Sequence, residues 1–143
     1  MNVGIALEER QRRIEQLYRP YHAAVDAAAA ASAAPWMFSV HTFTPLYEGN
    51  PRTLELGILF DTEEDAARSL GERCAQAGFE VDYNEPYSGR EGLIYSVERH
   101  ALKHGKRPLE IELRNDLAED PAKRGLLVEA LAEWFIEHQD GSL

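Results

Sequence analysis

The sequence has little of three things: cysteine, positive charge and long apolar runs. A single cysteine, Cys74, among 143 residues cannot form an intramolecular disulfide. The 15 Lys and Arg residues stand against 25 Asp and Glu residues, which gives a net charge of -10. Because binding to nucleic acid requires basic groups that neutralise phosphate, this balance disfavours a nucleic-acid partner. The most apolar stretch, 23–34, is rich in alanine and contains Asp26, so it is too short and too weakly apolar to span a membrane.

The first residues also lack the apolar core of a signal peptide, and we therefore expect a cytoplasmic protein without a membrane partner. Hydrophobic residues make up 44% and charged residues 28%, which is the balance of an ordinary soluble domain. The length of 143 residues predicts one domain. Twelve of the 15 basic residues are arginine, whose planar guanidinium fits a carboxylate, so a small anionic substrate is compatible with the acidic composition.

Hydrophobic periodicity predicts helices and strands that alternate along most of the chain. Pro20 is expected to kink the first helix or to mark a junction inside it. Turn-rich loops are predicted at 42–53 and 84–92. Strands that alternate with helices indicate a three-layer α/β architecture. The predicted helices are 8–33, 63–77, 93–104 and 121–138, and the predicted strands are 36–41, 54–60, 79–83 and 109–114.

His41 ends the first predicted strand, at a position where such folds often present a general base or a metal ligand. A histidine at a strand end is more often a structural residue that makes a hydrogen bond. No HExxH or CxxC pattern accompanies it, so its spacing indicates a metal site only weakly.

The predicted strand 109–114 carries two acids on one face, Glu110 and Glu112, and Arg114 continues that face. One interpretation is a solvated face with two exposed carboxylates. The other places one carboxylate at the edge of the sheet as a general base, beside an arginine that holds an anion. The sequence leaves both interpretations open.

The two loops offer candidate ligand-binding groups. The segment NEPYSGREG supplies Asn84, Tyr87, Ser88 and Arg90, and its glycines allow the backbone to approach a ligand closely. The same residue types also suit a turn that needs them for its geometry alone. Ser88 lies in no GxSxG pattern, which disfavours a serine nucleophile. Arg52 in the other loop is a further candidate for binding a carboxylate.

Several segments combine into a more specific signal. They are RPYH at 19–22, SVHTFTPLYEGNPR at 39–52, NEPYSG at 84–89, ERHA at 98–101 and EIELRNDL at 110–117. In this order they resemble motifs of the N-formylglutamate amidohydrolase family, in which the last four segments read SxHSFTPxxxGxxR, NxPYSG, ERHA and EIEIRxDL. Thr42 stands in place of the usual serine. The resemblance spans residues 19–117, most of the chain.

The resemblance implies a three-layer α/β/α fold with a mixed sheet of about four strands, similar to a truncated zinc-exopeptidase fold. It implies hydrolysis of the amide bond of an N-acyl (formyl) amino acid, with Zn2+ as the expected cofactor. The strand at 109–114 also resembles the FELRD strand of zinc carboxypeptidases. By that likeness Glu112 would be the general base and His41 a metal ligand.

The same resemblance assigns the substrate to the loops and to the last strand. Arg52, Arg90 or Arg114 would hold its carboxylates, and the sequence does not rank the three. Asn84 and Tyr87 would orient the amide, with Ser88 beside them.

Members of the family are longer and carry a His/Glu metal-binding motif in a segment before the RPYH helix. We therefore expect residues 1–143 to form the C-terminal portion of such a domain, with an incomplete metal site and no activity by itself. Two alternatives stay open. One is a non-catalytic module that binds a small dicarboxylate, and the other is a half-domain that associates with itself or docks on a separate N-terminal half.

Overall fold

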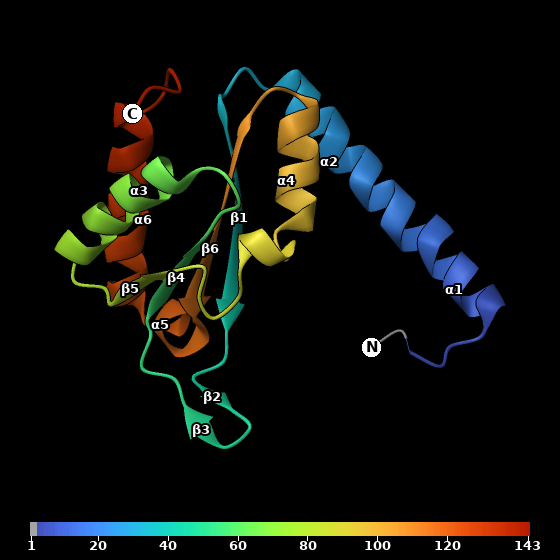
Figure 1. Cartoon of the computed structure of the whole chain (residues 1–143), viewed down its shortest axis with the longest axis horizontal. Coiled ribbons are helices and arrows are strands. Elements are labelled where there is room, and N and C mark those ends of the chain that lie inside the picture. The colour runs from blue at the N-terminus through green and yellow to red at the C-terminus, as the bar shows by residue number, and fades with distance from the viewer. Residues whose placement is uncertain (1–2) are drawn as a thin grey trace. The chain divides into compact units, whose positions relative to one another are not determined.

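The computed structural model describes residues 3–143, which form two compact units that divide after Ala33. The first unit is helical: α1 (Leu7–Arg13), a π-helical segment (Ile14–Tyr18) and α2 (Arg19–Ala31) follow one another without a break (Figure 1). Pro20 occupies the first turn of α2. Proline has no N–H for the helical ladder, and a π-helical segment before it accommodates that loss. The predicted junction in the first helix is thus confirmed.

The second unit is built on a mixed sheet of four strands in the order β1-β6-β4-β5. β1 runs parallel to β6, β4 runs antiparallel to β6, and β5 runs parallel to β4. The strands are β1 (Trp36–Phe43), β4 (Leu56–Leu59), β5 (Val81–Tyr83) and β6 (Arg107–Arg114). β1 and β6 pair along their whole length, which extends both beyond the predicted bounds.

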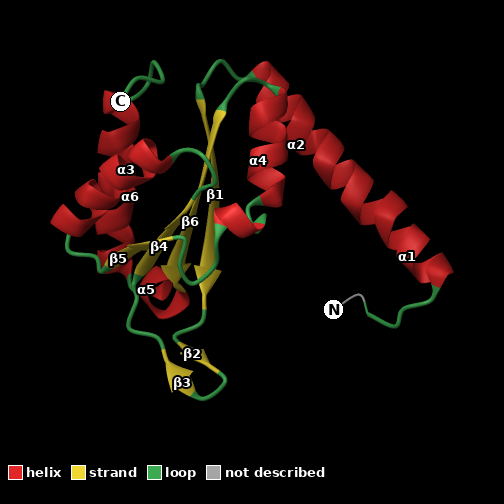
Figure 2. Ribbon diagram, viewed as in Figure 1, coloured by secondary structure: helices red, strands yellow, loops and turns green. Residues whose placement is uncertain are grey.

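Helices cover both faces of this sheet (Figure 2). α3 (Glu64–Gln76) and α6 (Pro121–Glu137) pack on one face, and α4 (Tyr95–Lys103) packs on the other. The larger core lies on the α3/α6 face, where the indole N–H of the buried Trp134 donates to Ser69 Oγ at 3.0 Å. A smaller apolar cluster lies on the α4 face and consists of Leu59, Ile94 and Val97. The predicted three-layer α/β/α fold is confirmed.

The prediction of loops at 42–53 and 84–92 was wrong in part. Residues of the first loop form a hairpin of β2 (Leu46–Tyr47) and β3 (Asn50–Pro51), and Gly89–Glu91 in the second form a short 3-10 helix. Glu48 and Gly49 connect β2 and β3 with φ of 49° and 82°, so both adopt the left-handed region that a tight two-residue hairpin requires. A short helix, α5 (Asn115–Glu119), also follows β6 and was not predicted.

The structure also locates the single cysteine and bears on the expected absence of a membrane-spanning helix. Cys74 is fully buried in α3, and burial raises the pKa of its thiol to about 12, which agrees with an inert core cysteine. Within residues 3–143, no helix has the length and apolar character needed to cross a membrane.

Candidate active site

The candidate site is centred on the α4 face of β6. Leu109 and Ile111 point into the core on the other face, so the glutamates that alternate with them face α4. Glu110 is 6% exposed and Glu112 is 5% exposed. The interpretation of a solvated face with exposed carboxylates is therefore wrong.

His41 reaches the two glutamates from the neighbouring strand. It lies opposite Glu112 in the parallel register of β1 and β6, and β1 continues past it to Phe43, so His41 does not end the strand. His41 Nε2 lies 3.9 Å from Glu110 Oε2, and one ligand atom from each of the three side chains lies within 4.8 Å of the others. The imidazole is 57% exposed, so this His41–Glu110–Glu112 cluster opens to solvent on the side of β1.

One oxygen of the Glu112 carboxylate lacks a hydrogen-bond partner. Its Oε2 atom is buried, and no donor in the described part of the chain makes a hydrogen bond to it. Burial raises the pKa of Glu112, and the charge of Glu110 raises it further, whereas His41 and Arg52 act in the opposite direction. A buried carboxylate without a partner costs free energy, so the cluster suits a cation or a transferable proton. The donor set thus fits a divalent metal ion.

Arg52 lies beside this cluster in an aromatic surround. Its guanidinium carbon lies 4.6 Å from the ring centre of Tyr47, 5.5 Å from that of Phe43 and 5.9 Å from that of Tyr87. Its Nη1 atom is buried without a hydrogen-bond partner among the described residues. The rings stabilise the guanidinium through cation–π contacts, and the N–H groups of Nη1 remain available to bind an anion.

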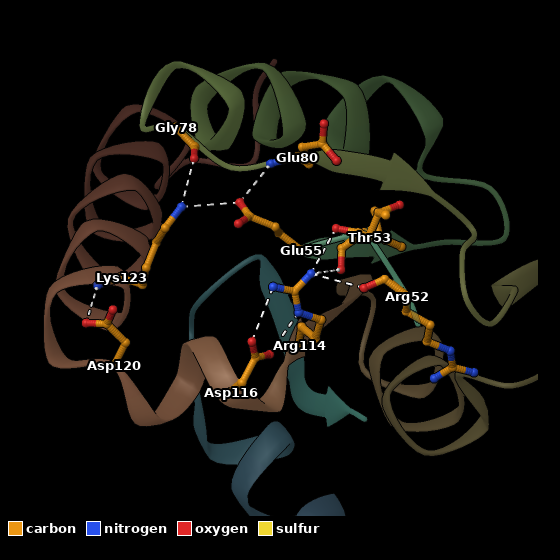
Figure 3. A network of polar contacts seen from close by, with 10 residues as sticks. Arg52, Thr53, Glu55, Gly78, Glu80, Arg114, Asp116, Asp120 and Lys123 are labelled. Atoms are coloured by element: carbon orange, nitrogen blue, oxygen red, sulfur yellow. Dashed lines mark hydrogen bonds and ion pairs between the residues drawn. The ribbon is translucent and has the colours of Figure 1, made fainter. Parts of the chain in front are cut away.

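Arg114 has a structural role, and its polar contacts are shown in Figure 3. Its Nη1 donates to the carbonyl oxygens of Arg52, Thr53 and Leu54 at 3.2, 2.9 and 3.3 Å, and its Nε donates to Asp116 Oδ1 at 2.8 Å. The side chain of Arg52 points away from this network. Arg114 therefore fixes the backbone segment that carries Arg52, and its own guanidinium is occupied.

The guanidinium of Arg90 also has partners within the protein. Its Nη2 donates to Glu64 Oε2 at 2.7 Å, and its guanidinium lies over the ring of Phe60 at 5.1 Å. Of the three arginines that the sequence left unranked, the structure brings Arg52 to the cluster with a partnerless nitrogen. It gives Arg90 and Arg114 protein partners.

Asn84 organises the loop before the 3-10 helix. It has φ of 55°, and its Oδ1 accepts from the backbone N–H groups of Phe60 at 3.1 Å and Gly89 at 2.9 Å. The loop presses on β4: a Cβ at Gly57 would lie 1.9 Å from the carbonyl oxygen of Glu85. Since Gly57 lies opposite Glu112 in the β4–β6 register, the loop covers the sheet beside the candidate base.

The other two loop candidates lie on this same framework. The ring of Tyr87 approaches Arg52, whereas Ser88 is half-buried ahead of the 3-10 helix, with its carbonyl oxygen accepting from Glu91 N at 3.2 Å. Sequence reasoning missed the rings of Phe43 and Tyr47 and the close approach at Gly57. A glycine inside an apolar strand is a sequence signal for such an approach.

A family model for N-formylglutamate amidohydrolase matches residues 2–118. The chain belongs to this family. The match includes β1, the Arg52 segment, the 84–89 loop and β6, and it ends before α6. Membership therefore covers every residue of the candidate site.

Two solved structures are similar to this chain in fold. The gene product Atu2144 from Agrobacterium tumefaciens has a TM-score of 0.72 and 31% identity, over 92% of this chain and 57% of that one. N-formylglutamate amidohydrolase from Ralstonia eutropha JMP134 has a TM-score of 0.63 and 21% identity, over 96% of this chain and 56% of that one. The chain thus spans a little over half the length of these two relatives. Among curated proteins no match was found.

Proposed function

We propose that this site takes part in the metal-dependent hydrolysis of the amide bond of an N-acyl amino acid, of the N-formylglutamate type. One observation carries the proposal: two buried atoms of opposite charge, Glu112 Oε2 and Arg52 Nη1, both lack a partner in the described structure. Family membership supports the hydrolase class. A substrate that combines a carboxylate with an acyl amide would satisfy the arginine and leave the carboxylate free for proton transfer.

Glu112 would act as the general base. Burial holds its pKa above the ordinary value for a glutamate, which brings the carboxylate nearer to the pH at which it can both take and return a proton. In this role Oε2 accepts a proton from the attacking water and delivers it to the leaving amine. The neighbouring His41 and Arg52 oppose this rise in pKa, because nearby positive charge favours the carboxylate form.

His41 would hold the metal ion, for which Zn2+ suits a set of imidazole and carboxylate ligands. A bound zinc ion would lower the pKa of a water molecule in contact with it and polarise the acyl oxygen. The exposure of His41 leaves this side of the cluster accessible to substrate.

Arg52 would bind the substrate carboxylate. With a net charge of -10, the chain as a whole repels an anion at a distance, so binding depends on a local group. The three rings around Arg52 restrict its side chain, which reduces the entropy lost on binding. Tyr87 would line the same subsite, while Asn84 and Ser88 contribute by shaping the loop.

Calorimetry with N-formylglutamate and Zn2+, together with an assay for released formate, tests the proposal. Arg52→Ala should weaken ligand binding about 10-fold or more, because it removes the charged hydrogen-bond donor. The matched control Arg90→Ala should leave binding unchanged, since Arg90 already pairs with Glu64. Any formate release should fall about 100-fold or more in Glu112→Gln. Absence of binding to the wild-type chain, or equal loss in both arginine variants, would contradict the proposal.

A second candidate, a non-catalytic module for a small dicarboxylate, is favoured by the aromatic rings around Arg52 and its partnerless Nη1, which would bind a carboxylate whether or not a metal ion is bound. Calorimetry with glutamate in the presence of a chelator distinguishes the two functions. Binding that persists without metal, with no formate release under any condition, would favour the module. Binding that requires Zn2+ would argue against it.

A further inference from the structure

We propose that Arg114 is a positioning residue: together with Asp116 it holds the backbone of residues 52–54 so that the guanidinium of Arg52 stays among its three rings, ready for a carboxylate. The inference rests on the proposed function and deepens it, because it concerns how the anion-binding group is held in place. The family resemblance left Arg114 as one of three arginines that could bind the substrate directly. Its contacts give it a role one step removed from the substrate.

The segment that carries Arg52 lacks the support of a strand. Residues 52–54 lie between β3 and β4 and belong to no helix or strand, so no ladder of hydrogen bonds holds them. The backbone N–H of Arg52 donates to the carbonyl oxygen of Pro45 at 2.8 Å, which ties the segment to the start of the hairpin. The carbonyl groups of such an irregular segment depend on donors from elsewhere in the chain.

One guanidinium supplies those donors. Arg114 Nη1 donates to the carbonyl oxygens of Arg52, Thr53 and Leu54 at 3.2, 2.9 and 3.3 Å. Arg114 Nε and Nη2 donate to the two carboxylate oxygens of Asp116 at 2.8 and 3.2 Å. This bidentate pair fixes the plane of the guanidinium, and the Arg114 side chain is only 16% exposed. A lysine could not reproduce the arrangement, since an ammonium group has no planar fork.

A second anchor holds the end of the same segment, at Glu55 (Figure 3). Glu55 Oε2 accepts from Lys123 Nζ and from the backbone N–H of Glu80, both at 3.2 Å. The carbonyl oxygen of Glu55 accepts from the backbone N–H of Arg114 at 2.9 Å. The side chain of Arg52 points away from these contacts, so the anchors hold its backbone without using its guanidinium.

This arrangement links the anion-binding arginine to the proposed base. Glu112 and Arg114 are two residues apart on β6, so the strand that carries the base also holds the segment of Arg52. Groups on strands are placed more accurately than groups on loops, and Arg114 extends that accuracy to a residue that lies in a loop. Because a displacement of about 1 Å can cost a large part of binding or rate, losing this support should weaken the site.

The test follows the side chain of Arg52 by NMR and measures ligand binding separately. The Nε–H resonance of Arg52, assigned as the one that disappears in Arg52→Ala, is displaced by the ring currents of its three aromatic neighbours. The variants are Arg114→Gln and Asp116→Ala, and the second leaves Arg114 in place in case the first does not fold. Circular dichroism checks folding, and calorimetry with N-formylglutamate and Zn2+ measures affinity.

Arg107→Gln is the matched control. Arg107 begins the same strand, at the end away from Arg114, and it also donates to a carboxylate and to a carbonyl oxygen. These acceptors are Glu63 Oε2 and the carbonyl oxygen of Gly141, both at 2.8 Å. Its loss therefore removes the same kinds of hydrogen bond from β6 without touching the segment of Arg52.

In Arg114→Gln we expect the Arg52 resonance to move toward the position of an exposed arginine and the affinity to fall about 10-fold or more. Asp116→Ala should show a smaller change of the same kind, and Arg107→Gln should show neither. In the double variant Arg52→Ala/Arg114→Gln, the affinity should equal that of Arg52→Ala alone, because a positioning residue acts through the group that it positions. A purely structural role would instead make the two losses add.

The outcomes separate this inference from the proposed function. An unchanged Arg52 resonance or unchanged affinity in a folded Arg114→Gln or Asp116→Ala variant would overturn the inference, as would additive losses in the double variant. If the resonance moves as expected but the wild-type chain binds no N-formylglutamate, the positioning role stands and the proposed function fails. If the wild-type chain binds the ligand and the variants keep both the resonance and the affinity, the proposed function stands and the positioning role fails.

Discussion

The two faces of β6 are both buried, but one is apolar and the other carries carboxylates. On one face Leu109, Ile111 and Leu113 are at most 4% exposed and pack against apolar side chains. On the other, Glu110 and Glu112 are at most 6% exposed, and Glu112 Oε2 is buried without a hydrogen-bond partner among the described residues. Burial stabilises the first face, because apolar surface leaves water. On the second face burial is a cost, which indicates that this face is shaped for a ligand rather than for stability.

The largest expected effect on stability comes from a substitution that disrupts the packing of the apolar face. Ile111→Ala should lower the free energy of unfolding by about 2–5 kcal/mol, because it leaves a cavity in a fully buried position. Urea denaturation followed by circular dichroism measures the change. The matched variant on the opposite face, Glu112→Met in metal-free buffer, should be neutral or stabilising, since it removes an unpartnered carboxylate. A comparable destabilisation by Glu112→Met would contradict the distinction between the two faces.

The second prediction concerns the loop that presses on the polar face. Gly57→Ala should lower the free energy of unfolding by about 1–3 kcal/mol, because its Cβ would overlap the carbonyl oxygen of Glu85 and displace the loop. Gly125→Ala in α6 is the matched control, since nothing lies within 4 Å of the new Cβ. It should stabilise the chain by about 0.5–1 kcal/mol through helix propensity. Thermal and urea unfolding measure both, and equal behaviour of the two variants would show that the approach at Gly57 is not close.

The third prediction separates the structural from the ligand-binding role of Asn84. Asn84→Ala should lower the free energy of unfolding by about 1–2 kcal/mol, because the N–H groups of Phe60 and Gly89 lose their acceptor. Asn84→Asp keeps an acceptor and tolerates positive φ, so it should remain close to the wild type. Urea denaturation compares the two variants. An Asn84→Ala variant with unchanged stability would show that the side chain is kept for the ligand alone.

The apolar face could be predicted from the sequence, whereas the polar face could be predicted only in part. Period-two alternation identified β6 and placed its two glutamates on one side. It did not show that side to be buried, because the burial comes from the packing of α4 and of the 84–89 loop, which the alternation within the strand does not encode. Strand patterning is a local property, and the covering of a face is not.

The arginines illustrate the same limit. Sequence placed Arg52, Arg90 and Arg114 near the ends of strands and loops, and their residue type alone suited all three to a carboxylate. The three arginines differ in their interaction partners in the folded chain. Arg114 donates to three carbonyl oxygens of residues about 60 positions away, and Arg52 is surrounded by rings from the end of β1, from the β2–β3 hairpin and from the 84–89 loop. Such partners follow from the fold and not from local sequence.

The smallest expected effect is a pH dependence of stability, which distinguishes the polar face of β6 from the apolar one. Burial raises the pKa of Glu112 above its ordinary value of 4.5, so the folded chain holds this proton more tightly than the unfolded chain does. The stabilising contribution is fully present below pH 4.5 and is lost as the pH rises through the raised folded pKa. In chelator-treated buffer, the wild type should therefore lose stability relative to Glu112→Gln as the pH increases. Urea denaturation at several pH values measures the difference, and Ile111→Val supplies a control from the opposite face whose offset should not vary with pH. A constant offset between wild type and Glu112→Gln would mean that Glu112 ionises in the fold as it does in water, and the polar face would then carry no electrostatic cost for a ligand to relieve.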